Sequence, residues 1–375
     1  MTVSEPHWAD EDTPAELAAA ADEMLAEILT RTSIRTEIDE YGFSCDAWKA
    51  AVEAGWFQVA LTEDHDGLGL GLSGLAGIAQ AVGRHLLPGP ITDHAVVLPM
   101  LIPDASEPAR ERLNTAINGA AITVLVDGAA GSADGSALPQ LLDGRLTGAV
   151  EFVRFGTHAD ELLVAAVGER QEPTVALISA SADGVTVTSQ PSFDPIIRYA
   201  TVGLDNVAVD HVVLVPGTQT AVKLAELRAA VRLFTAAETA GVARRLLDTS
   251  VEFALERHQF GKPIGSFQAI KHLLADMAAA TLMLEIASAD ALQRAVDHSL
   301  LESLSWQSKA LAAWVGRQVG EGALQVHGGV AFTIEHDVHR GFQHALALQG
   351  IDGDERELAR KLGWALLRGE LEPWA

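Results

Sequence analysis

The sequence predicts a mainly α-helical protein that carries a β-strand-rich domain in its middle. Three textures along the 375 residues support this prediction. Apolar residues recur at helical spacing in the first third, short β-branched runs fill the middle, and Ala- and Leu-rich stretches occupy the remainder. A chain of this length exceeds what one hydrophobic core usually organises, so we expect two or three domains. We predict domain limits at residues 1–120, 121–215 and 216–375.

The first third is expected to form helices over residues 14–29, 46–55 and 75–85. Between them, residues 69–74 satisfy G-x-G-x-x-G, the spacing of the dinucleotide-binding fingerprint. That fingerprint requires a strand that leads into the glycine turn, whereas the polar residues 63–67 come before it here. We therefore interpret the segment as a glycine-rich turn before a helix.

The middle of the chain predicts strands at residues 122–126, 162–167, 175–178 and 185–187, each bounded by Gly, Asp or Pro. From Thr220 onward, long helical patterns follow, with breaks near residues 260–263 and 328–329. Pro263 lacks a backbone N–H and would interrupt a helix, so two helices are expected to meet near it. Elements segregated in this way indicate separate layers rather than alternating βαβ units.

Composition excludes several classes of function. A net charge of −25 would repel nucleic acid and anionic membranes, so any phosphate site must be a local cluster of Arg and backbone N–H groups. The single cysteine, Cys45, excludes an intramolecular disulfide, fits a reducing cytoplasm, and is expected to be buried. The acidic N-terminus is unlike a signal peptide, and no uncharged apolar stretch of about 18 residues appears. We therefore expect a cytoplasmic protein with no membrane or nucleic-acid partner.

The most informative segment is RHQFGKPIGSFQ at residues 257–268. An Arg at a helix end offers a two-pronged donor to a pyrophosphate, and Gly261 and Pro263 shape a turn that brings backbone close to a ligand. A plain turn beside an incidental surface Arg is the alternative. The segment resembles the R-x-x-F-G-x-P-x-x-x-F-Q signature of the acyl-CoA dehydrogenase family.

A second segment, ALQVHGGVAF at residues 323–332, resembles the Q-x-x-G-G-x-G-F element of the same family. In that family the Gln and glycines meet the flavin nucleotide across a subunit interface. Adjacent glycines let backbone approach a phosphate, although they also end helices. The two resemblances together imply FAD contacts from Arg257, Gln259, Phe260, Ile264, Gln268, Gln325, Gly328 and Gly329.

Further resemblance extends over nearly the whole chain. Residues 61–69 look like the family's P-E-x-x-G-G-x-G loop, and residues 204–209 look like the last strand of its β domain. The resemblance implies an N-terminal helical domain, a β-barrel-like middle domain and a C-terminal four-helix bundle. It also implies a flavin that lies between domains in a dimer or tetramer.

Two family features are altered in this sequence. Residues 126–132 and 150–153 do not match the T-E-P-x-x-G-S-D and W-I-T segments that bind the flavin ring. The family's catalytic glutamate lies either on the first C-terminal helix, a position that falls here at Val231, or in a late loop, a position that falls at Asp352.

Two carboxylates are candidates for the base that is missing at Val231. Asp352 has the right charge and a shorter side chain, against the alternative that Asp352 and Gly353 form only a turn. Glu238 is seven residues beyond Val231, near the same helical face, against the alternative of a buried carboxylate paired with an Arg.

Three histidines, His336, His339 and His344, lie near helical spacing. They lack accompanying cysteines or an H-E-x-x-H pattern, so no metal site is predicted. Solvated helix positions are the expected explanation.

The resemblance implies α,β-dehydrogenation of an acyl-CoA thioester, with electrons passed from FAD to an electron-transferring flavoprotein. The sequence keeps the phosphate-binding signatures, whereas its ring-binding segments are altered. In this combination it resembles actinobacterial heteromeric α2β2 enzymes that act on steroid side-chain CoA esters. We predict a partner subunit that lends Arg257 and Gln325 to flavin held by a homologous chain. The alternatives are a self-sufficient homo-oligomer that uses Asp352 or Glu238, and a non-catalytic structural or binding paralogue.

Overall fold

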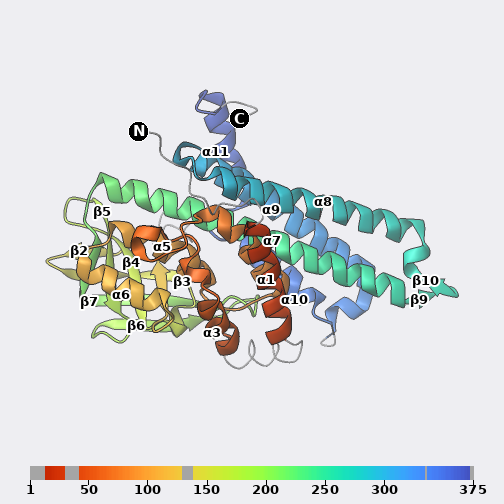
Figure 1. The fold of residues 1–375 in the computed structure, drawn as a ribbon, viewed down its shortest axis with the longest axis horizontal. Helices are drawn as coiled ribbons and strands as arrows, with labels where there is room; N and C mark the ends of the chain where they lie inside the picture. The colour runs from red at the N-terminus through yellow and green to blue at the C-terminus, as the bar shows by residue number, and fades with distance from the viewer. Residues whose placement is uncertain (1–12, 30–41, 129–137, 334–335, 372–375) are drawn as a thin grey trace.

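Helices and one large sheet are arranged in the predicted order in the computed structural model, which describes residues 13–29, 42–128, 138–333 and 336–371 (Figure 1). The expected helices of the first third are confirmed to within two residues. Helices precede the sheet at Thr13–Ile28 (α1), Cys45–Glu53 (α3), Ala76–His85 (α4), Leu98–Leu101 (α5) and Glu107–Ile117 (α6).

Two smaller expectations about this region had opposite outcomes. Cys45 is exposed, so the expectation of burial was wrong; it is the first residue of α3, whose N-terminus is capped by the Ser44 side chain. The glycine-rich segment, residues 69–74, follows the 3₁₀ turn Glu63–His65 and runs into the 3₁₀ turn Leu72–Leu75, and no strand leads into it. Its interpretation as a turn before α4 is confirmed.

The middle of the chain forms an eight-stranded sheet in the order β6-β7-β3-β2-β4-β5-β8, with β1 paired in parallel to β4. Its strands are Thr123–Val126 (β1), Gln140–Leu142 (β2), Arg145–Arg154 (β3), Glu161–Val167 (β4), Pro173–Ser179 (β5), Val185–Gln190 (β6), Tyr199–Ala208 (β7) and His211–Leu214 (β8). The four predicted strands correspond to β1, β4, β5 and β6. Residues 204–209 mostly lie in β7. The resemblance implied that they form the last strand of the β domain, which is wrong because β8 follows β7.

The sheet separates two hydrophobic cores, and β4 contributes to both because it is buried on both faces. Leu163 and Ala165 pack with the helical core, whereas Leu162 and Val164 pack with a smaller core on the opposite face. This alternation follows from the two-residue period of a strand. One face of the sheet is therefore fixed against the helices, and this arrangement sets the geometry of the cavity described below.

The C-terminal part is a helical bundle built around one very long helix, α7 (Thr218–Glu256). It packs with α8 (Gln268–Arg294), α9 (His298–His327) and α10 (Val338–Gln349), and α11 (Glu355–Leu367) follows on α9. The four-helix bundle implied by the resemblance is confirmed.

A short hairpin joins α7 to α8 at the far end of the bundle (Figure 1). Its strands are His258–Gln259 (β9) and Lys262–Pro263 (β10). Phe260 and Gly261 form its two-residue turn, and both have positive φ, 53° and 80°. That geometry belongs to the tight turns that match strand twist. The expected meeting of two helices near Pro263 is confirmed.

Helices α4 and α7 cross at a pair of glycines with almost no space between the backbones. A Cβ atom added to Gly83 would lie 1.9 Å from the carbonyl oxygen of Glu238. A Cβ atom added to Gly241 would lie 1.9 Å from the carbonyl oxygen of Gln80. Because those atoms are backbone, no side-chain rotation relieves the overlap, and the two helices would have to separate.

Replacing Gly241 with alanine is therefore expected to lower the free energy of unfolding by about 1–3 kcal/mol, measured by urea denaturation. Gly363 in α11 is the matched control, because a Cβ atom there meets nothing within 4 Å. Gly363→Ala should raise the stability by about 0.4–1 kcal/mol, since alanine favours the helix. Equal stability of Gly241→Ala and the wild type would show that the crossing tolerates a side chain.

Candidate functional site

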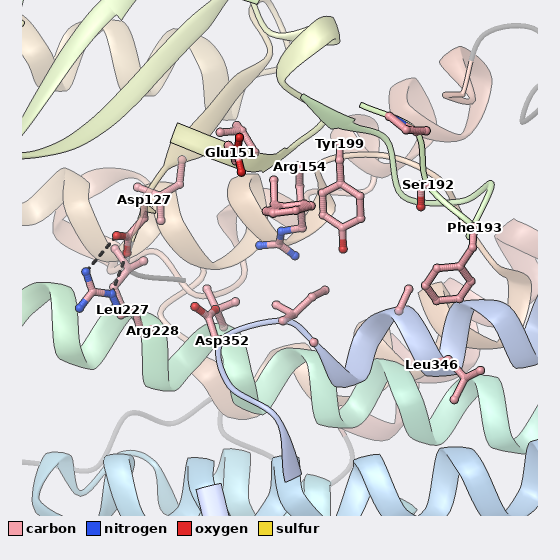
Figure 2. Close-up of a pocket in the computed structure, with 18 residues that line it drawn as sticks. Asp127, Glu151, Arg154, Ser192, Phe193, Tyr199, Leu227, Arg228, Leu346 and Asp352 are labelled. Atoms are coloured by element: carbon pink, nitrogen blue, oxygen red, sulfur yellow. Dashed lines mark hydrogen bonds and ion pairs between the residues drawn. The ribbon is translucent and has the colours of Figure 1, made fainter. Parts of the chain in front are cut away.

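A cavity of about 400 Å³ lies where the sheet meets α7 and α10 (Figure 2). Its walls come from the end of β1, the end of β3, the start of β7, the residues that follow β6, and the residues around the C-terminus of α10. The lining residues used below are Asp127, Phe152, Arg154, Phe193, Tyr199, Arg228, Val231, Leu346 and Asp352. The volume lies within the range of small-molecule pockets.

Both positions at which the family places its glutamate line this one cavity. Val231 contributes a hydrocarbon surface from α7, and Asp352 follows α10 with a positive φ of 55°. The backbone carbonyl of Asp352 accepts a hydrogen bond from Nε of Arg232 at 2.7 Å. Burial raises the pKa of the Asp352 carboxyl, and Arg232 opposes that effect. Asp352 is therefore a cavity-lining carboxyl at the position where counting from the signature predicts the family's base.

A charged pair closes one end of the cavity. Arg228 donates from Nε to Oδ2 of Asp127 at 2.7 Å and from Nη2 to Oδ1 at 3.0 Å. Asp127 is the second residue of the segment 126–132, which is expected to correspond to a family ring-binding loop; residues 129–132 lie outside the described residues. A two-pronged ion pair, in which each charge is neutralised by the other, therefore occupies this end of the cavity.

Sequence reasoning missed the two most central polar groups, Arg154 and Tyr199. Figure 2 shows both side chains pointing from the sheet into the middle of the cavity, toward Asp352. The ring-binding comparison ended at Val153, one residue before Arg154. The strand period gave no signal for Arg154, because residues 151–154 all line the cavity beside a register shift in β3.

Glu238 does not line the cavity. Its Oε1 lies 3.1 Å from Nε2 of His344, while Nδ1 of His344 lies 2.9 Å from Oδ2 of Asp194. All three side chains are buried, so the expectation of a solvated His344 was wrong, and the partner of Glu238 is a histidine rather than an arginine. Burial lowers the pKa of His344, but the two carboxylates outweigh it and raise the pKa to about 10. The triad is an ion-paired link between the sheet domain and the bundle.

The predicted cofactor-binding residues gather at the other end of α7. Arg257 caps α7, and its exposed side chain forms no hydrogen bond or ion pair within the part of the chain that the structure describes. The Phe260 ring is 91% exposed at the hairpin tip. Gln259, Gln268, Gln325, Gly328 and Gly329 are exposed, and Ile264 is partly buried.

The two signature segments lie at the same end of the bundle. Phe253, one turn before Arg257, stacks on His327 with 4.4 Å between ring centroids, and His327 immediately precedes Gly328. Cβ atoms added to Gly261, Gly328 or Gly329 would meet nothing within 4 Å, so their backbone is open to approach. An unpaired guanidinium beside accessible backbone N–H groups fits the diphosphate of a dinucleotide.

The cavity and the predicted phosphate-binding residues are far apart on the same chain. Val231 and Arg257 are 26 residues apart along α7. At 1.5 Å per residue the separation is about 39 Å. That distance exceeds the length of an extended FAD, so one FAD molecule does not span both places on one chain.

Sequence comparison relates the chain to known proteins. Residues 225–363 match the family model described as the acyl-CoA dehydrogenase C-terminal domain. The chain is 30% identical over 337 residues to acyl-CoA dehydrogenase IpdE2 of Mycolicibacterium smegmatis, covering 86% of this chain and 88% of that protein. It is 32% identical over 336 residues to acyl-CoA dehydrogenase FadE34 of Mycobacterium tuberculosis, covering 86% of this chain. The chain spans only 43% of the length of FadE34.

Solved structures show the same fold over nearly all of the chain. The ChsE4-ChsE5 complex from Mycobacterium tuberculosis aligns with a TM-score of 0.85 and 27% identity, covering 98% of this chain and 99% of that one. The Tcur3481-Tcur3483 steroid ACAD G363A variant aligns with a TM-score of 0.86 and 25% identity, covering 96% and 99%.

Proposed function

The chain belongs to the acyl-CoA dehydrogenase family, and on that premise we propose that it is the partner subunit of a heteromeric, FAD-dependent acyl-CoA dehydrogenase. The observation that carries the proposal is the cavity, where Val231 stands at the position expected for the base, while the predicted phosphate-binding end lies about 39 Å away and would serve a neighbouring chain. Arg257 and Gln325 would bind the diphosphate portion of an FAD whose ring is held by a homologous sister chain. That sister chain would supply the catalytic glutamate.

The proposed reaction introduces a double bond between the α and β carbons of an acyl-CoA. A carboxylate base removes the α proton, and bound FAD would accept the hydride that leaves the β carbon, which yields a trans-2-enoyl-CoA. Electrons would then pass to an electron-transferring flavoprotein, as the family resemblance implies. The contribution of this chain is to bind and orient the cofactor through Arg257, Gln325 and the backbone at Gly328.

The cavity supports assignment of the chemistry to the sister chain. Val231 cannot accept a proton, and residues 126–132 and 150–153 do not match the family's ring-binding segments. Asp352 is one methylene shorter than glutamate, and proton abstraction depends strictly on reach. These three differences act in the same direction, because each weakens a part of the active site that this chain would need to work alone.

A second chain is supported by exposed apolar surface and by the structural neighbours. Leu282, Met283 and Ile286 on α8 are 52%, 43% and 61% exposed, which is typical of a helix that a partner covers. By length and composition alone α8 also suits a membrane span, a test that helices of soluble proteins pass as well. The neighbours named above are assemblies, one of them a steroid ACAD. We therefore extend the proposal to an α2β2 complex in the cytoplasm that acts on a steroid side-chain or other bulky acyl-CoA.

The experiment that tests the proposal is expression of this chain alone and together with its sister chain. We expect the single chain to be colourless and inactive, and the co-purified complex to be yellow, to contain one FAD per pair of chains and to oxidise acyl-CoA. A yellow, fully active homo-oligomer from the single gene would contradict it.

The alternative of a self-sufficient enzyme is favoured by one observation, the cavity-facing Asp352 with its raised pKa. Under that alternative, Asp352→Asn or Glu238→Gln abolishes turnover while flavin stays bound. Under our proposal, the Asp352→Asn complex turns over at the wild-type rate. A colourless, inactive complex would instead indicate the non-catalytic paralogue.

A further inference from the structure

We propose that the cavity of this chain binds an apolar monocarboxylate, with its carboxylate held by Arg154 and Tyr199. The inference goes beyond the proposed function, and it rests on that function in one respect: the flavin ring lies on the sister chain and leaves this cavity free. The ligand would be a fatty-acid-like molecule rather than a CoA ester.

Arg154 and Tyr199 form a built pair of donors. They are direct partners in the antiparallel register of β3 and β7, so their side chains leave the same face of the sheet. Figure 2 shows the guanidinium and the phenolic oxygen side by side in the cavity. A guanidinium fork and a neighbouring hydroxyl together match the two oxygens of one carboxylate.

Neither donor is committed to another group in the part of the chain that the structure describes. The Arg154 side chain forms no hydrogen bond and has no carboxylate within ion-pair distance there, and the hydroxyl of Tyr199 likewise has no hydrogen-bond partner. The nearby carboxyl of Asp93 already accepts the backbone N–H of Leu125 at 2.9 Å. A cation in a half-buried cavity is costly to leave unpaired, so an anion is the complementary ligand.

The surrounding charges favour a single carboxylate. Asp127 and Arg228 neutralise each other. The exposed carboxylate of Glu151 also lines the cavity but forms no ion pair with Arg154, which leaves Arg154 as the cavity-lining cation without an ion-pair partner among the described residues. Burial raises the pKa of Asp352, which lessens repulsion of an incoming anion, and burial raises the pKa of Tyr199 to about 12, which keeps its hydroxyl a donor. One free cation offers too little charge for the several phosphate charges of CoA.

The rest of the cavity suits an apolar body. Phe193 and Leu346 lie at the end opposite the Asp127–Arg228 pair (Figure 2). Phe152 and Phe193 are 52% and 59% exposed, so they present apolar surface that a ligand would remove from water. A ligand that runs from Arg154 toward Phe193 would place its carboxylate against the donors and its hydrocarbon chain against the apolar residues.

The test is calorimetric titration of the co-purified complex with octanoate, octanamide and octan-1-ol. Octanoate should bind at least tenfold more tightly than the two neutral probes. Arg154→Met in this chain should weaken octanoate at least tenfold, and Tyr199→Phe should weaken it severalfold. Arg145→Gln is the matched control on β3, because the Arg145 side chain bonds the backbone of Asn206 outside the cavity and the affinity should not change.

Equal binding of octanoate and octanamide, or unchanged octanoate affinity in Arg154→Met, would overturn the inference; the second result would assign octanoate to the sister chain. If Arg154→Met does not fold, Tyr199→Phe and the probe series still decide. The FAD content separates this inference from the proposed function. Two FAD per pair of chains would contradict the proposed function, whereas one FAD per pair without octanoate binding contradicts only the inference.

Discussion

Replacing His344 with alanine is expected to lower the free energy of unfolding by about 3–5 kcal/mol, the cost of breaking a buried ion pair from one side. The imidazolium lies between the buried carboxylates of Asp194 and Glu238, at 2.9 and 3.1 Å. Without it, two carboxylates remain in the interior with no cation between them. Guanidinium denaturation measures the loss, because the midpoint falls with stability.

His339→Ala is the control on the same helix, because the ring of His339 is only partly buried and contacts a single carbonyl, that of Ala331. It should cost about 1 kcal/mol. If the two alanine variants unfold at the same denaturant concentration, the triad is not the ion-paired link that its geometry indicates.

The same triad gives the stability a defined dependence on pH. The pKa of His344 is about 10 in the folded chain, above the usual histidine value of 6.5, so the folded state holds the proton more tightly. Its contribution is complete below about pH 6.5 and is lost as the pH rises toward 10. Burial lowers the pKa of Lys309 to about 8, which acts with the opposite sign in part of that range. The stability difference between wild type and His344→Ala should therefore shrink over that interval.

Arg257→Ala in the assembled complex is expected to weaken FAD binding by about tenfold to more than a hundredfold. The physical reason is loss of a charge-assisted contact to the diphosphate, worth about 1.5–3 kcal/mol. The FAD affinity of Arg257→Lys should lie between those of the wild type and Arg257→Ala, because an ammonium group keeps the charge and loses the two-pronged donor geometry. Titration of the FAD-free complex with FAD, followed by flavin fluorescence, gives the affinities.

Arg294→Ala is the control for this measurement. Arg294 ends α8 at the opposite side of the bundle from the hairpin and pairs with Asp290 at 3.6 Å. Its loss should leave FAD affinity unchanged. Wild-type affinity in Arg257→Ala would remove the basis for assigning the hairpin to the diphosphate.

Local signals in the sequence predicted most of the fold. Helical spacing located α1, α3 and α4, and β-branched runs located four strands, because these patterns are complete within a few residues. β3 was missed since its ten residues include Gly148 and long exposed stretches, and it is defined by pairing with β7. The extent of α7, Thr218–Glu256, agrees with the helical pattern that begins at Thr220 and first breaks near residues 260–263.

Only the site residues at a known sequence separation from a motif could be predicted. Counting residues from the two signature segments singled out Val231 and Asp352. The structure places both in one cavity, although they are far apart in sequence. Glu238 shares the helical face of Val231, but seven residues carry it about 10 Å along α7 and away from the cavity. The Asp127–Arg228 and Arg154–Tyr199 pairs depend on tertiary packing, which a single sequence without aligned relatives does not reveal.

The length of α7 has a genetic consequence for the complex we propose. Because the hairpin serves a cofactor seated on another polypeptide, a lesion at Arg257 would appear as a fault in the sister's catalysis. Supplying more of the sister protein would not repair it, whereas a second intact copy of this gene would. The two genes would then complement separately, although the complex needs both products in matched supply.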